Sequence, residues 1–86
     1  MPYISMFFGI IIRMFYNEHN PPHFHAEYQG QRGIFDFNGN LIDGKIRSKT
    51  ARKIIKKWAL IHKKELESNW NNINNGEELI RIAPLD

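Results

Sequence analysis

Three of the four histidines lie in one short segment, residues 18–28, which reads EHNPPHFHAEY. Alternate side chains of a β-strand project from the same face, so His23, His25 and Glu27 would form one row, with the intervening apolar residues toward the core. His19 comes just before two prolines, whose restricted dihedral angles hold the preceding turn stiff. The chain has no cysteine, so thiolate metal sites and cysteine nucleophiles are excluded.

This row of side chains is compatible with three kinds of site. His23, His25 and a carboxylate would bind a divalent metal such as zinc, nickel, copper or iron. Alternatively, the histidines would act as general acid and base without a metal, completed by Glu27 or Arg13, because imidazole has an unperturbed pKa of about 6.5. In the third interpretation they are polar groups on an exposed sheet face, or contact a protein or nucleic-acid partner. The residues alone leave these alternatives open.

A second candidate surface is the basic stretch between Lys45 and Lys64, in a chain of net charge +3. Its cations lie mostly off the apolar stripe of a predicted helix and could line a phosphate track. The other interpretation is a solvated helix face. Trp58 and His62 fall on the apolar stripe, which favours packing roles for both.

Four segments have the composition of strands and would form an antiparallel meander. They are 4–16 (bent at Gly9), 23–28, 33–38 and 41–42. The intervening residues 29–33 read as a turn, and Asn38-Gly39 indicates a two-residue hairpin.

A long helix is predicted after these strands. Ser48 is a good N-cap, the apolar stripe runs to about Asn74, and Gly76 would end the helix. Residues 79–82 then form a short strand that returns to the sheet edge. The expected fold is therefore α+β: an antiparallel sheet of three or four strands, with one long helix packed on one face and a short C-terminal strand.

The length of 86 residues predicts one domain, 1–86. The apolar run at 6–12 lacks a preceding basic region and is far shorter than the roughly 20 residues of a membrane helix. We therefore expect a soluble cytoplasmic protein without a membrane partner. Homo-oligomerisation stays open.

The chain resembles the bacterial family called domain of unknown function 4160. The resemblance rests on PYISMFFGI at the start, IRMFYNEH before the prolines and NPPHFHAEY after them, together with Trp58, His62, Asn69-Trp70 and the closing IAPL. It covers essentially the whole chain. The family pattern includes Arg13, His19, His23, His25, Glu27, Trp58 and His62. The basic stretch 45–47 replaces an acidic loop typical of the family.

The resemblance implies a small free-standing bacterial protein encoded beside a second small protein, an arrangement typical of toxin–antitoxin pairs. We therefore expect a toxin–antitoxin component that acts on RNA through His19, His23, His25, Glu27 and Arg13. The first alternative is a non-catalytic module that binds protein or nucleic acid through the histidine face and the basic helix. The second is a metal-dependent hydrolase with His23 and His25 as metal ligands.

Overall fold

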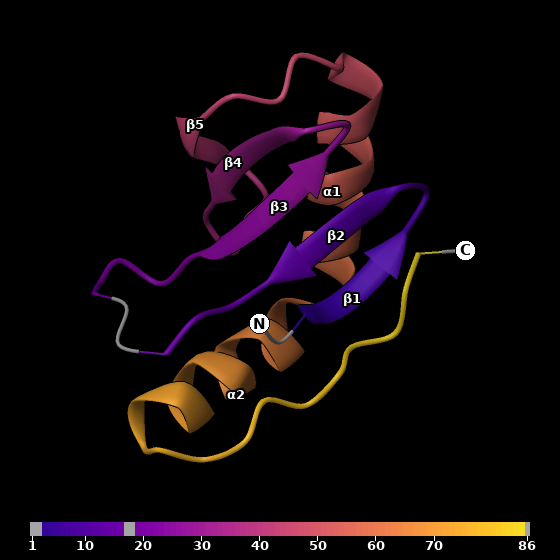
Figure 1. Ribbon diagram of the computed structural model, residues 1–86. Helices are drawn as coiled ribbons and strands as arrows, with labels where there is room; N and C mark the ends of the chain where they lie inside the picture. Colours follow the sequence, from indigo (N-terminus) through magenta and orange to yellow (C-terminus); the bar gives the residue numbers. More distant parts are fainter. Residues whose placement is uncertain (1–2, 17–18, 86) are drawn as a thin grey trace.

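The computed structural model describes residues 3–16 and 19–85. Five strands come first: β1 (Tyr3–Phe7), β2 (Ile10–Arg13), β3 (Phe24–Tyr28), β4 (Gln31–Phe35) and β5 (Leu41–Gly44). Two helices follow, α1 (Lys49–Ile61) and α2 (Lys63–Asn74). The strands form one antiparallel sheet in chain order, and both helices lie on one side of it (Figure 1). The expected α+β class and antiparallel meander are confirmed.

The sheet has more strands than the three or four expected, because residues 4–16 form two of them. Phe8 and Gly9 both have positive φ, 49° and 78°, and connect Phe7 to its partner Ile10. Gln29 and Gly30 repeat this geometry between β3 and β4, with φ of 48° and 77°. Two-residue turns of this kind match the twist of the strands that they join. The turn at Phe8-Gly9 was not predicted, because it lies within an apolar run. The turn at Gln29-Gly30 is shorter than the turn predicted at 29–33.

The connection between β4 and β5 is longer than the predicted two-residue hairpin at Asn38-Gly39. The backbone N–H of Asp36 donates to the Asn40 carbonyl at 3.0 Å, and the N–H of Gly39 donates to the Asp36 carbonyl at 3.0 Å. Gly39 has a φ of 83°. The carboxylate of Asp36 also accepts from the backbone N–H groups of Asn38 and Asn40. These bonds begin the turn at Asp36, so β4 ends at Phe35 and not at Asn38.

Two helices replace the predicted single one. Helix α1 begins as expected, with the Ser48 hydroxyl accepting from the Ala51 N–H at 3.1 Å. The backbone leaves helical geometry only at His62, where φ is −109° and ψ 23°. The helix axis changes direction there, and α2 runs across the end of the sheet (Figure 1). The three- and four-residue spacing of apolar side chains continues through His62, so it did not predict the bend. Gly76 follows the end of α2 with a φ of 72°, as predicted.

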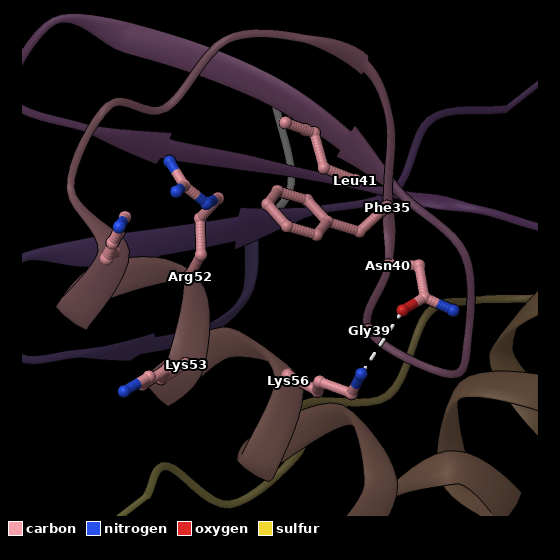
Figure 2. A pocket seen from close by; sticks show the side chains of 8 residues that line it. Phe35, Gly39, Asn40, Leu41, Arg52, Lys53 and Lys56 are labelled. Carbon is pink, nitrogen blue, oxygen red and sulfur yellow. Dashed lines mark hydrogen bonds between the residues drawn. The ribbon is translucent and has the colours of Figure 1, made fainter.

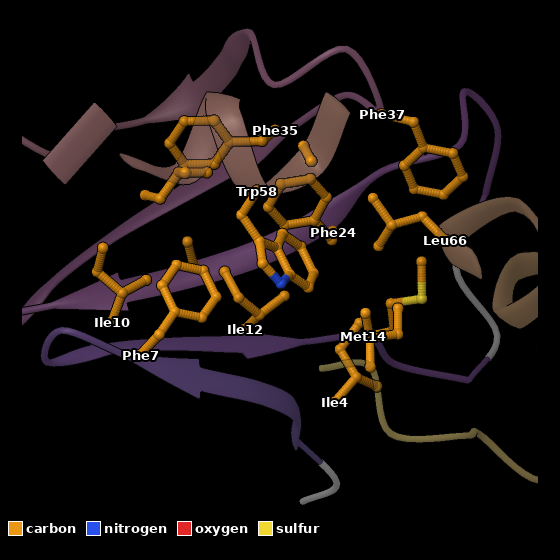
Figure 3. Close-up of a cluster of buried hydrophobic side chains, with 14 of the residues drawn as sticks. Ile4, Phe7, Ile10, Ile12, Met14, Phe24, Phe35, Phe37, Trp58 and Leu66 are labelled. Carbon is orange, nitrogen blue, oxygen red and sulfur yellow. The ribbon is translucent and has the colours of Figure 1, made fainter. Parts of the chain in front are cut away.

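The core fills the space between the sheet and the two helices. Trp58 is fully buried at its centre, as its position on the apolar stripe predicted, within 5.3 Å of the Phe7 ring and 5.7 Å of the Phe24 ring (Figure 3). Its indole N–H donates to the Ala83 carbonyl at 2.9 Å. Residues of β1, β3 and the C-terminal segment thus meet around one side chain of α1.

The C-terminal segment, residues 77–85, runs beside α2 and β1 without forming the predicted strand at 79–82 (Figure 1). The N–H of Ile82 donates to the Ile4 carbonyl at 2.8 Å, which covers part of the β1 edge. The buried side chain of Asn69 binds both the N–H of Ile80, at 2.9 Å, and its carbonyl, at 2.8 Å. An amide side chain therefore supplies the bonds that a neighbouring strand would have supplied.

In the described residues, neither helix is long and apolar enough to cross a membrane.

Candidate functional site on the open face of the sheet

The open face is the side of the sheet turned away from α1 and α2. The predicted alternation is confirmed within β3: Phe24 and Ala26 are fully buried on the helical side, whereas His25 and Glu27 are half-buried on the open face. His23, predicted to begin this strand, lies just before it. The strand pairing extends this face over its neighbours. Its central side chains are Met6, Ile11, Arg13, His25, Glu27, Arg32 and Ile34.

Arg13 and Glu27 form an ion pair at the centre of the open face. The guanidinium Nε donates to Glu27 Oε2 at 2.7 Å, and the two side chains are 22% and 26% exposed. Glu27 is on β3 and lies directly opposite Arg32 on β4. It therefore stands beside two arginines, and its bond to Nε sets the orientation of the Arg13 guanidinium.

His25 lies opposite Arg13 on β2 and opposite Ile34 on β4. The rings of His25 and Phe15 make an edge-to-face contact, with their centroids 4.6 Å apart. Phe15 follows Arg13 by two residues, which places it on the same side of the chain. The imidazole is therefore held between an aromatic ring and a cationic side chain.

His23 stands where the open face meets α2. Its ring lies 5.4 Å from the His25 ring and 5.3 Å from the ring of Trp70 on α2. Its Nδ1 is 2.7 Å from the Pro21 carbonyl. A carbonyl oxygen accepts only, so Nδ1 must carry a proton. In the neutral ring the lone pair is then on Nε2, the form that accepts a proton or binds a metal.

A recess of about 340 Å³ opens beside Trp70, on which the His23 ring rests. It is lined by Pro22, Phe37, Glu67, Trp70 and Asn71. The prolines before β3 therefore have a second effect besides restricting the chain, because Pro22 forms one wall of this recess.

His19 is exposed in the connection between β2 and β3. Among the described side chains, the ring contacts that join His23 and His25 do not include His19. Of the five predicted site residues, the structure therefore brings four together, Arg13, His23, His25 and Glu27. Residue 18, also in the histidine-rich segment, lies outside the described residues.

Within residues 3–16 and 19–85, no three His, Asp or Glu side chains are grouped so that they could hold a metal ion. His23 and His25 would supply two nitrogen ligands, but no carboxylate of the described residues is grouped with them as a third ligand. The metal site at His23 and His25 stays a prediction.

His62 has the packing role that its position suggested. Its ring lies 5.6 Å from Trp58, and its Nδ1 is 2.6 Å from Glu65 Oε1. It is on the helical side of the sheet and at the bend between α1 and α2, so it is not part of the open face.

Sequence reasoning missed three contributors to the candidate site. Phe15 and Trp70 hold the two imidazoles, and Arg32 flanks Glu27. Alternation from Arg13 to Phe15 was a usable signal for Phe15. The position of Arg32 depends on the strand register, and that of Trp70 depends on the course of α2 after the bend. Residue spacing along one strand predicts neither.

These features define a small α+β domain whose sheet carries its packing residues on one face and a histidine pair with an arginine–glutamate pair on the other. The family model described as a domain of unknown function (DUF4160) matches residues 9–71, and the chain belongs to this family. The matched range includes all five predicted site residues and ends just after Trp70. No curated protein and no solved structure matches the chain.

Proposed function

We propose that the open face binds single-stranded RNA and that His23 and His25 cleave the bound strand by acid–base chemistry. The observation that carries the proposal is the pairing of these two rings at 5.4 Å, on a face that also holds Arg13. One of the two rings, His23, has its Nδ1 proton fixed by the Pro21 carbonyl. Single-stranded RNA is typically bound by stacking of bases on aromatic rings and Arg planes, and Phe15 and Arg13 would supply such contacts.

The reaction would be attack of a ribose 2′-hydroxyl on the adjacent phosphorus. His23 Nε2 would accept the 2′ proton as the new P–O bond forms. His25, protonated, would donate a proton to the 5′ oxygen as the P–O bond to the leaving strand breaks. The Arg13 guanidinium, oriented by Glu27, would neutralise charge on the phosphate oxygens. The products are a 2′,3′-cyclic phosphate and a 5′-hydroxyl, and no co-reactant is required.

Such an activity fits the toxic component of a toxin–antitoxin pair, which is the role we propose in the cell. The antitoxin would be the small protein encoded beside it. Covering the open face would inhibit cleavage directly, because the histidines are on the surface that the partner would bind.

The test is cleavage of a fluorescent single-stranded RNA by the purified chain and by His23→Ala and His25→Ala. Each replacement should reduce the rate about 10²-fold, the usual contribution of one proton transfer. The rate should be bell-shaped in pH, because one ring must be neutral and the other protonated. His62→Gln is the matched control, since it removes a histidine from the helical side and should retain the rate if it folds. Intact RNA at every pH, with folded protein, would overturn the cleavage proposal.

A second candidate function is binding of the partner protein without any reaction. Met6 and Ile11 are direct cross-strand neighbours on the open face, and Met6 is 49% exposed. Ile34 lies beside His25 on the same face. An apolar set of this kind among charged residues is typical of a protein interface. If the chain is a pure binding module, Met6→Lys should abolish partner binding, and neither the natural chain nor the variant should cleave RNA. RNA cleavage by the natural chain would contradict this candidate.

A further inference from the structure

A second cationic site lies on the helical side of the sheet, between α1 and the β4–β5 connection (Figure 2). It is a pocket of about 330 Å³. Its lining residues are Phe35, Gly39, Asn40, Leu41, Lys49, Arg52, Lys53 and Lys56. Four of these eight residues are cationic, and none is acidic.

The cations all come from α1, at spacings of three and four residues, so they share one face of the helix. The first turn of α1 has no acidic residue and contains Lys49 and Arg52. The N-terminus of a helix carries partial positive charge and favours anions. Cations placed there repel that charge and one another, and a bound anion in the pocket would offset both effects.

The pocket has fixed walls. Arg52 Nη1 donates to the backbone carbonyls of Ile46 and Arg47, the latter at 3.0 Å, and these bonds anchor the guanidinium without using Nη2. Lys56 Nζ lies 3.3 Å from Asn40 Oδ1 across the opening (Figure 2). The wall formed by Gly39 packs so closely that a Cβ there would lie 2.6 Å from the Lys56 Cα. The loop and the helix are therefore held at a set distance.

The floor of the pocket differs from its rim. Phe35 is fully buried below it, and Leu41, 38% exposed, borders it. An apolar surface beside a row of cations on one wall suits a ligand with a flat organic part and a phosphate. The volume is also at the lower end of the range of about 300–1,000 Å³ for small-molecule pockets.

We infer that this pocket binds a nucleotide phosphate, with Lys53, Lys56 and Arg52 on the phosphate and Leu41 against the base or sugar. The phosphate would come from a free mononucleotide or from the 5′-terminal nucleotide of an RNA strand. The site is separate from the histidine pair, and the inference does not rest on the proposed cleavage.

The probes are adenosine 5′-monophosphate and adenosine, added to the ¹⁵N-labelled full chain and followed by the shifts of backbone amide signals. Adenosine monophosphate should shift the amides of residues 39–41 and 49–56, and adenosine should bind much more weakly. Equal binding of the two probes would overturn the inference, because the phosphate would then not be recognised. Absence of shifts at residues 39–41 at millimolar nucleotide would also overturn it.

The variant Lys53→Gln/Lys56→Gln should weaken nucleotide binding at least about tenfold, as expected for lost charge-assisted hydrogen bonds. Lys57→Gln/Lys64→Gln is the matched control, because both lysines are exposed, neither lines the pocket and the loss of charge is the same. An equal loss in both double variants would mean diffuse attraction and would contradict a defined site. A change in melting temperature would identify a variant that fails to fold, and Lys53→Gln alone then serves in its place.

A competition experiment identifies the source of the phosphate. A 5′-phosphorylated RNA oligonucleotide displaces adenosine monophosphate from the pocket if the site holds an RNA end, and the same strand with a 5′-hydroxyl does not. Failure of both strands to displace the nucleotide assigns the site to free mononucleotides. Both results support a phosphate pocket. His23→Ala/His25→Ala should keep full nucleotide affinity, which separates this inference from the proposed cleavage.

Discussion

The two faces of β3 carry alternate side chains of the same strand but are used differently. On the helical side Phe24 is fully buried, stacked on Phe35 at 5.6 Å and in contact with Trp58. On the open face His25 and Glu27 are half-buried and contact Phe15 and Arg13. Burial of large apolar groups dominates stability, whereas partly exposed polar pairs contribute little.

From this difference we expect the stability of the chain to be separable from the proposed chemistry of the open face. Residues of the helical side determine where β3 lies, and through it the position of the histidines. We expect changes of open-face residues to cost little folding free energy, because these side chains are partly exposed. The free energy of unfolding should therefore change most for variants of the helical side and least for variants of the open face.

Trp58→Ala should reduce the free energy of unfolding by about 3–5 kcal/mol, the usual cost of removing a large buried aromatic side chain. The loss of the indole bond to Ala83 adds to the cavity. Chemical denaturation measures the change. Lys57→Ala, at the exposed neighbouring position, is the control and should stay within about 0.5 kcal/mol. A small effect of Trp58→Ala would show that the core does not centre on this residue.

Asn69→Ala should destabilise the protein by about 1–3 kcal/mol, because the backbone N–H and carbonyl of Ile80 both lose their hydrogen bond to this side chain. Asn69→Asp retains an acceptor for the Ile80 N–H and loses the donor to its carbonyl. Asn71→Ala, exposed on the same helix, is the matched control. Amide hydrogen exchange at Ile80 and Ile82 should accelerate in Asn69→Ala. Unchanged exchange there would mean that the segment is held by other contacts.

The fold class and the faces of β3 were predictable because alternation along a strand is a local property. Burial of Trp58 and the start of α1 at Ser48 followed from equally local signals, a three- and four-residue spacing and a capping residue. The turn at Phe8-Gly9 was missed because apolar side chains flank it on both sides. Its phenylalanine adopts a positive φ that is uncommon for a residue with a side chain.

The candidate site was predictable only as a set of residue types. Arg13 was expected to complete an acid–base site with the histidines, and the family pattern includes it, but its actual neighbour depends on the register between β2 and β3. The pocket on α1 combines residues of a helix with residues of a loop. Basic residues along the helix were visible in the sequence, but the loop that closes the pocket was expected to be a tighter hairpin.

His25→Ala should reduce the free energy of unfolding by about 0.5–1.5 kcal/mol, because it removes the partly exposed ring that contacts Phe15 and His23. The same change should remove most RNA cleavage. Phe15→Leu is the companion variant, since it removes the ring contact and retains the imidazole. Its RNA affinity should fall with a similar small loss of stability. A cost for His25→Ala as large as that of Trp58→Ala would contradict the separation of the two faces.

The smallest effect is expected at the ion pair of Arg13 and Glu27. A double-mutant cycle with Arg13→Gln, Glu27→Gln and both changes together should give a coupling of about 0.2–1 kcal/mol in stability, because both side chains are partly exposed. The coupling should decrease in high salt, since solvent ions screen exposed charges. A coupling well above this range would mean that the open face is shielded from solvent, for example in a complex.

The functional coupling of the same pair should be larger than its coupling in stability. If Glu27 acts only by orienting Arg13, then Glu27→Gln weakens RNA binding in the natural chain and has no further effect once Arg13 is glutamine. RNA affinity at fixed salt measures both steps. An equal loss from Glu27→Gln in both backgrounds would instead assign Glu27 a contact of its own with the strand. The ion pair would then contribute to recognition through two independent groups and not through one oriented guanidinium.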